Sequence, residues 1–242
     1  MKVSLEGKHI FVLGATGAIG RAILESAQEC GAWVGGSYFR NEEGAAQLKA
    51  HGIFIEQADL ADRRQARAAV AHAIQAAGQL DALVYAAGNV RDHLLVNMQD
   101  DEWDQVLALH LDGLMACCQE VLPHMQGRRS GKLVAITSFA GLTGRVGQAN
   151  YSAAKAATIG FMKTVAREAG RFGVTANIVS PGFIESGMTR AVPQEGWERA
   201  KAASALGTIS SVKVVASFTT WLLSDLCHGV TGQLFCLDSR VL

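Results

Sequence analysis

Residues 9–20 read HIFVLGATGAIG, a short apolar run followed at once by a glycine-rich turn. The run His9–Leu13 predicts a buried strand, and the pattern over Gly20–Cys30 predicts a helix that ends before Gly31. Glycines at such a turn let the backbone approach a phosphate, and the first N–H groups of the helix attract an anion. The stretch therefore predicts the dinucleotide-binding turn of an α/β fold, with a tight turn that binds nothing as the alternative.

The rest of the chain continues this alternation of strand and helix. Further strands are expected at Trp33–Tyr38, Gly52–Gln57, Ala82–Ala86, Lys132–Thr137, Thr175–Ser180 and Gln233–Leu237. Further helices are expected at Glu42–Ala50, Arg63–Ala77, Glu102–Met125, Tyr151–Phe172 and Ser210–Ser224. This order predicts one Rossmann-type domain over residues 1–242, a three-layer α/β sandwich with a seven-stranded, mostly parallel sheet. The irregular stretch Phe183–Leu206 is long enough to form a lid over a site.

Composition excludes several classes of protein. The 242 residues carry 22 basic and 22 acidic side chains, which argues against a nucleic-acid binder that works by bulk charge. No apolar run approaches the length of a membrane span, and the N-terminus does not resemble a signal peptide. The five cysteines lack the spacing of a metal site or a disulfide framework. We therefore expect a soluble, cytoplasmic protein without a structural metal.

The end of the second expected strand bears on the choice of dinucleotide. An acidic residue there would hold a ribose 2′-hydroxyl, but the sequence continues to Arg40 instead. An arginine suits a 2′-phosphate, so the pattern predicts NADP(H), unless Arg40 is merely an exposed surface residue. Asp59, after the third strand, is placed either to accept a hydrogen bond from an adenine amino group or to cap a turn.

Ser138, Tyr151 and Lys155 form the constellation with the clearest chemistry. Ser138 follows a buried strand, at the edge where doubly wound sheets bind ligands. Tyr151 and Lys155 are four residues apart and share one face of a helix. An ammonium group near the phenol would lower its pKa toward that of a useful general acid, and Ser138 would polarise a carbonyl oxygen. A surface Tyr–Lys pair beside an unrelated serine is the alternative.

With these motifs, the chain resembles the short-chain dehydrogenase/reductases over about residues 5–237, and within them the 3-oxoacyl-[acyl-carrier-protein] reductases. The matching stretches are Gly14–Gly20, Gly88 with Arg91-Asp92, Glu102–Asp104, Ser138, Gln148–Lys155 and Pro181–Thr189. The resemblance implies NADPH-dependent reduction of a 3-oxoacyl thioester in fatty-acid or polyketide-like biosynthesis. It also implies a homotetramer built through the helices Glu102–Met125 and Tyr151–Phe172.

The resemblance also implies which residues contact the cofactor. Tyr151 and Lys155 would serve both the chemistry and the cofactor. The others are Gly14, Thr16, Gly17, Ala18, Ile19, Gly20, Arg40, Asp59, Leu60, Ala87, Gly88, Pro181, Gly182, Ile184 and Ser186.

The sequence departs from the family pattern at several of its motifs. The usual Asn-Asn-Ala-Gly is Tyr85–Gly88, the middle glycine of the phosphate turn is Ala18, and a usual Asp-Gly-Gly becomes Asp238–Arg240. The catalytic Asn of the family is replaced by His110, which lies on an apolar helix stripe. His110 is therefore either a buried structural residue or the holder of a water that feeds protons to Lys155.

Two further features leave alternatives open. The sequence places four basic residues near one another, and they form either a solvated surface or a dock for an acidic acyl carrier protein: Arg128, Arg129, Lys132 and Arg171. The activity itself has two alternatives, a reductase of free small carbonyls or alcohols and a weakly active subunit in a mixed oligomer. The departures above favour the second alternative, whereas the intact Ser138, Tyr151 and Lys155 argue against it.

Overall fold

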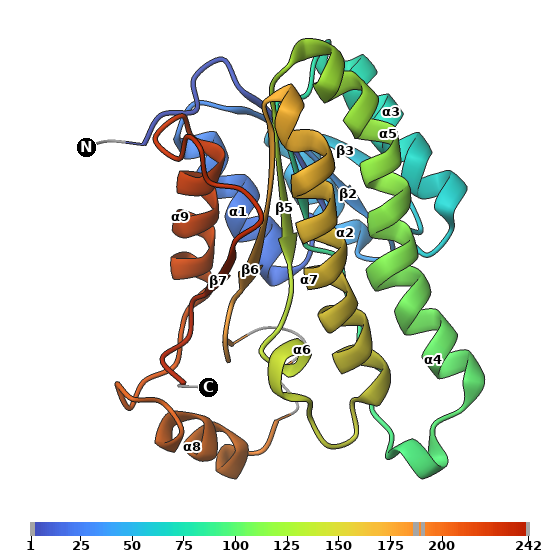
Figure 1. Ribbon diagram of the computed structural model, residues 1–242, viewed down its shortest axis with the longest axis vertical. Coiled ribbons are helices and arrows are strands. Elements are labelled where there is room, and N and C mark those ends of the chain that lie inside the picture. Colours follow the sequence, from blue (N-terminus) through green and yellow to red (C-terminus); the bar gives the residue numbers. More distant parts are fainter. Residues whose placement is uncertain (1–2, 186–188, 190–191, 241–242) are drawn as a thin grey trace.

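The computed structural model describes residues 3–185, 189 and 192–240, and these build one parallel sheet in the order β3-β2-β1-β4-β5-β6-β7 (Figure 1). The strands are β1 His9–Leu13, β2 Trp33–Tyr38, β3 Phe54–Gln57, β4 Ala82–Tyr85, β5 Gly131–Ile136, β6 Val174–Ser180 and β7 Leu234–Cys236. The strand order reverses between β1 and β4, so a crevice opens there at the carboxyl ends of the strands. The predicted seven-stranded Rossmann-type sheet is confirmed, and every pairing in it is parallel.

Helices cover both faces of the sheet and make it the middle of three layers (Figure 1). One face packs against α1 Ala18–Glu29, α2 Glu42–Ala50 and α9 Val212–Leu223. The other face packs against α3 Arg63–Ala77, α5 Gly113–Arg128 and α7 Ala149–Ala169. Side chains of β1 alternate between the two cores, with Phe11 and Leu13 on the α3 side and Ile10 and Val12 on the α1 side. This two-sided burial explains why β1 is apolar from Ile10 to Leu13.

The long middle helix is not regular. It starts as α4 Asp100–Leu107, widens into a π-helical turn over Ala108–Asp112, and continues as α5. The whole stretch Asp100–Arg128 is long and apolar enough to cross a membrane by length and composition. It packs against α3 and α7, and seven residues of its α5 part are buried in the fold, so it is a core helix of this domain.

Some expected boundaries were wrong. The third strand begins at Phe54 rather than at Gly52, because Gly52 has φ +73° and belongs to the turn that follows α2. The stretch expected to be irregular contains α8 Gln194–Ala202, and a short helix, α6 Ala140–Thr143, follows β5. Both helices lie below the carboxyl edge of the sheet in Figure 1, close to the crevice.

The expected cluster of four basic residues does not exist as one surface. Arg128 forms an ion pair with Asp81 at 2.7 Å, and Lys132 donates to the carbonyl oxygens of Leu222, Ser224 and Cys227 at 2.7–3.1 Å. Arg128 therefore links α5 to the start of β4. Lys132 caps the carboxyl end of α9. Of the four, the exposed residues are Arg129 and Arg171, and the Arg129 guanidinium donates to the Arg171 carbonyl oxygen.

Candidate active site

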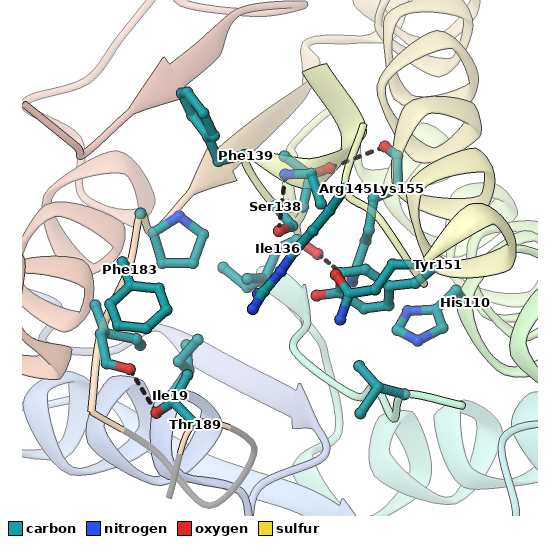
Figure 2. A pocket seen from close by; sticks show the side chains of 18 of the residues that line it. Ile19, His110, Ile136, Ser138, Phe139, Arg145, Tyr151, Lys155, Phe183 and Thr189 are labelled. Carbon is teal, nitrogen blue, oxygen red and sulfur yellow. Dashed lines mark hydrogen bonds between the residues drawn. The ribbon is translucent and has the colours of Figure 1, made fainter. Parts of the chain in front are cut away.

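A pocket opens at the carboxyl edge of the sheet, where the strand order predicts one. Ser138, Tyr151, Lys155 and His110 all line it, so the structure brings together the four residues singled out for chemistry (Figure 2). Cofactor positions expected from the sequence line the same pocket: Ile19, Ala87, Gly88, Pro181, Gly182 and Ile184. The shared pocket requires β1, β4, β5 and β6 to end side by side, which follows from the parallel topology.

Ser138 and Tyr151 approach each other from different elements. Ser138 comes just after β5, and its Oγ accepts a hydrogen bond from the Ala140 backbone N–H at 3.2 Å. Tyr151 lies in the first turn of α7 and is 9% exposed, with its hydroxyl beside Ser138. Two hydroxyl groups that face one small cavity can bind a single carbonyl oxygen between them.

Lys155 lies one helical turn after Tyr151 and is buried. Its Nζ donates to the Ile136 carbonyl oxygen at 2.9 Å and lies 5.7 Å from the centre of the Tyr151 ring. Burial lowers the pKa of Lys155 to about 7, so only part of the population carries a charge at neutral pH.

The direction of the Tyr151 shift differs from the expectation. Burial raises the pKa of Tyr151 above its usual value, and the Ser138 hydroxyl and the Arg145 charge oppose this only partly. Lys155 is itself partly uncharged, so it does not bring the phenol pKa down in this state of the site. Tyr151 is therefore held as a neutral phenol across the physiological range, which is the form that can donate a proton.

His110 lies on the π-helical turn and is 2% exposed. Its ring meets the Tyr151 ring edge to face, with 5.3 Å between centroids, and its Nε2 lies 2.9 Å from the Asn89 carbonyl oxygen and 3.2 Å from the Asn89 amide nitrogen. Burial, and then the nearby Lys155 charge, hold the pKa of His110 well below its usual value. The buried Nδ1 has no hydrogen-bond partner among the described residues. The imidazole is thus neutral and carries one unused polar atom at the site.

Tyr85, one of the departures from the family pattern, stabilises the π-helical turn. The Tyr85 hydroxyl donates to the Leu109 carbonyl oxygen, next to His110. A π-helical turn leaves backbone groups without their usual helical partners, and π-turns are frequent at functional sites. Tyr85 satisfies one such carbonyl group and so links β4 to the turn that carries His110.

The glycine-rich turn has the shape that a dinucleotide requires. A Cβ at Gly14 would lie 2.7 Å from the Ala87 Cα atom, and one at Gly20 would lie 2.2 Å from the Gly14 carbonyl oxygen. Helix α1 has no side-chain cap and no acid in its first turn, and the N–H groups of Ala18, Ile19 and Gly20 have no acceptor among the described residues. Free N–H groups at a helix N-terminus suit a pyrophosphate, and Ala18 in place of glycine is accommodated as an exposed residue.

Other expected cofactor residues lie outside the pocket lining. Arg40, just after β2, is exposed; its guanidinium lies 4.8 Å from the Phe39 ring centre and makes no ion pair among the described residues. Asp59 caps a turn through the Ala61 amide, and the Leu60 side chain is buried in the core. Thr16 and Gly17 belong to the turn before α1, and Ser186 lies outside the described residues.

Several residues of the pocket are not predicted by the sequence pattern. Arg145, Phe183 and Arg240 line it, and they lie on loops rather than on regular elements. The available signal for Arg145 was its place between two glycines, six residues before Tyr151. Arg240 belongs to the departure from the family pattern at Asp238–Arg240; it forms an ion pair with Asp238, and its guanidinium lies 4.0 Å from the centre of the Phe139 ring.

Known proteins share this sequence and fold over nearly the full chain. The 3-oxoacyl-[acyl-carrier-protein] reductase FabG of Staphylococcus aureus is 38% identical over 232 residues, which cover 93% of this chain and 94% of the relative. The FabG of Salmonella typhimurium is 37% identical over 238 residues, 96% of each chain.

Solved structures agree with these relatives. The crystal structure of a blue fluorescent protein from a metagenomic library, in complex with NADPH, has a TM-score of 0.89 with 29% identity and covers 98% of each chain. The crystal structure of gox2181 has a TM-score of 0.91 with 26% identity, and it covers 98% of this chain and 96% of its own. The family model for short chain dehydrogenase matches residues 8–197. The chain therefore belongs to the short-chain dehydrogenase family and is an oxidoreductase.

Proposed function

We propose that this oxidoreductase uses NADPH to reduce a 3-oxoacyl thioester, carried by an acyl carrier protein, to the 3-hydroxyacyl product. The observation that carries the proposal is the meeting of Ser138, Tyr151 and Lys155 in one pocket beside the glycine-rich turn. The activity named for the FabG relatives, at 37–38% identity, supports the choice of substrate. We place the enzyme in the cytoplasm, in fatty-acid or polyketide-like biosynthesis.

The residues of the pocket divide the chemistry among them. When bound, NADPH supplies the hydride that reduces the ketone carbon. Ser138 and Tyr151 hold the ketone oxygen, and the neutral Tyr151 phenol donates its proton to that oxygen as the negative charge develops. Lys155 binds the ribose hydroxyls and returns a proton to Tyr151. Neutral His110 holds the water that supplies Lys155, using the Nδ1 atom that has no protein partner.

The complete reaction is the first test. Purified enzyme is assayed by NADPH oxidation with a carrier-bound 3-oxoacyl thioester, the same acyl group on free pantetheine, and simple ketones. We expect the fastest turnover with the carrier-bound form, and we expect added salt to reduce that advantage because Arg129 and Arg171 steer an acidic carrier. Turnover of simple ketones without turnover of any thioester would contradict the proposal.

The proposal includes the oligomer that the family resemblance implies. We propose a homotetramer built through α4 and α5 together with α7; α4 packs against α7, and α5 and α7 contribute side chains to the same core on one face of the sheet. Light scattering of the purified enzyme measures this directly, and a monomer at working concentrations would contradict it.

Arg40 is expected to select NADPH. Arg40→Ala should raise the KM for NADPH and leave the KM for NADH nearly unchanged, because the exposed guanidinium is free to bind a 2′-phosphate. Losing one charge-assisted contact costs about 1.5 to 3 kcal/mol, or about ten- to a hundredfold in affinity. Steady-state kinetics with both cofactors measure this, and equal KM values in the unmodified enzyme would refute the assignment.

His110 has its own expected result. His110→Asn should keep substantial turnover, since an amide can hold the same water, whereas His110→Leu should lose turnover but remain folded in its apolar surroundings. The lowered pKa of His110 keeps the ring neutral, so any loss of turnover caused by protonation of the ring should appear only below the usual histidine pKa. The measurements are turnover between pH 5 and 8 and the thermal midpoint. Full activity in His110→Leu would assign the residue a structural role.

A further inference from the structure

The charged side chain of Arg145 lies at the pocket without a partner among the described residues. Arg145 lines the pocket with Ser138 and Tyr151, and Figure 2 shows its side chain reaching into the space in front of them. Its guanidinium makes no ion pair and no hydrogen bond with any described residue. Its charge is near enough to lower the pKa of Tyr151. A guanidinium offers five N–H donors, so Arg145 presents an unused set of donors to a bound molecule.

The backbone that carries Arg145 is held in place. Gly144 and Gly147, on either side of Arg145, have φ angles of +70° and +79°. A Cβ on either glycine would lie in open space, so glycine is needed there for the backbone conformation of the turn and not for close packing. The Gln148 amide donates to the Arg145 carbonyl oxygen at 3.0 Å, and the Gln148 side chain donates to Asp92 at 2.9 Å. The turn therefore projects Arg145 from a fixed position at the pocket.

The other charged groups of the pocket are already engaged. Arg240 is paired with Asp238 and stacks on Phe139. Asp92 accepts two hydrogen bonds from Gln148, and Lys155 donates to a backbone carbonyl oxygen. Among the described residues of the pocket, Arg145 is thus the one cation that a substrate finds free.

We infer that Arg145 determines substrate specificity by binding a second oxygen of the substrate, the thioester carbonyl that lies two carbons from the reacting ketone. The inference rests on the function proposed above, in which Ser138 and Tyr151 hold the ketone oxygen. A 3-oxoacyl thioester has two carbonyl groups, at C1 and C3, separated by one methylene group. With the first oxygen between the two hydroxyls, the second meets the donors of Arg145, which line the same pocket.

Arg145 acts on this substrate in two separable ways. Its charge acts on Tyr151 whatever ketone is bound, because the Tyr151 pKa depends on charge near the phenol. Its fork of donors acts only on a substrate that has a second oxygen. A simple ketone therefore experiences the first effect alone, whereas a 3-oxoacyl thioester experiences both.

The test compares kcat/KM for a 3-oxobutanoyl pantetheine thioester and for a simple methyl ketone of matched length. We expect Arg145→Leu to lose about ten- to a hundredfold on the thioester, mainly through KM, and less than about threefold on the simple ketone. Arg145→Lys keeps the charge and should retain the unmodified pH profile, but it should recover only part of the thioester loss. Arg91→Leu removes an exposed arginine that does not line the pocket, and it should change neither substrate.

The outcomes separate this inference from the proposed function. If the unmodified enzyme reduces the thioester, but Arg145→Leu loses equally on both substrates or on neither, the inference is wrong and the proposed function stands. If the unmodified enzyme reduces the simple ketone and no thioester, the proposed function itself is wrong. A selective loss on the thioester, with the circular dichroism spectrum and thermal midpoint unchanged, supports Arg145 as the residue that recognises the second oxygen.

Discussion

We expect Tyr151→Phe to lower kcat by at least about a hundredfold, the low end for loss of a general acid. The phenylalanine ring keeps the edge-to-face contact with His110, so the fold and the KM for NADPH should change little. Stopped-flow or steady-state NADPH oxidation measures the loss. Tyr38→Phe is the matched control, because Tyr38 packs against the core on the α1 side of the sheet and does not line the pocket.

The pH profile of the unmodified enzyme gives a second check on Tyr151. Burial raises the pKa of Tyr151, so the phenol stays protonated through neutral pH and its own capacity to donate a proton should not change there. The overall rate should fall as the pH rises, first as Lys155, whose pKa is about 7, loses the proton that it returns to Tyr151, and further at alkaline pH as the phenol ionises. A reduction rate that rises with pH through neutrality, or near-normal turnover in Tyr151→Phe, would mean that another group is the acid.

Lys155→Met should abolish turnover and, at the same time, stabilise the protein. Burial holds the pKa of Lys155 at about 7, whereas a lysine in an unfolded chain titrates near 10.4. Between these values the unfolded chain binds a proton that the folded enzyme does not, so the free energy of unfolding rises with pH across this window. At pH 7 the buried amine therefore costs stability, and an apolar side chain of similar length should recover about 1 to 4 kcal/mol.

Chemical denaturation at pH 7 and pH 9 measures this effect for both proteins. The rise in unfolding free energy between the two pH values should be smaller in Lys155→Met than in the unmodified enzyme. Lys132→Met is the control, because Lys132 caps α9 through three carbonyl oxygens. That variant should lose about 1 to 3 kcal/mol and keep its turnover per folded molecule. Equal free energies of unfolding for Lys155→Met and the unmodified enzyme at pH 7 would show that the buried lysine does not reduce stability.

Local patterns in the sequence were sufficient to predict the architecture and the four pocket residues singled out for chemistry. The order of apolar runs and helices predicted the parallel sheet, because a buried strand of this kind needs apolar residues on both faces. The spacing of Tyr151 and Lys155 predicted a shared helix face, and the position of Ser138 after a buried strand predicted its place at the ligand edge. These predictions held because each depends on local periodicity or on the rule that parallel strands end at one edge.

The electrostatics of the pocket and the role of each charged side chain depend on tertiary packing. Burial makes His110 neutral, keeps Tyr151 protonated and lowers the pKa of Lys155, and burial comes from packing among segments far apart in the chain. Lys132 looked like a surface charge but caps a helix about ninety residues away in the sequence, whereas Arg145 looked like a loop residue and reaches the pocket. Periodicity identifies the face of an element on which a side chain lies. Only the packing of the elements determines which groups surround that side chain and how much water reaches it. Those two factors set its charge and its chemistry.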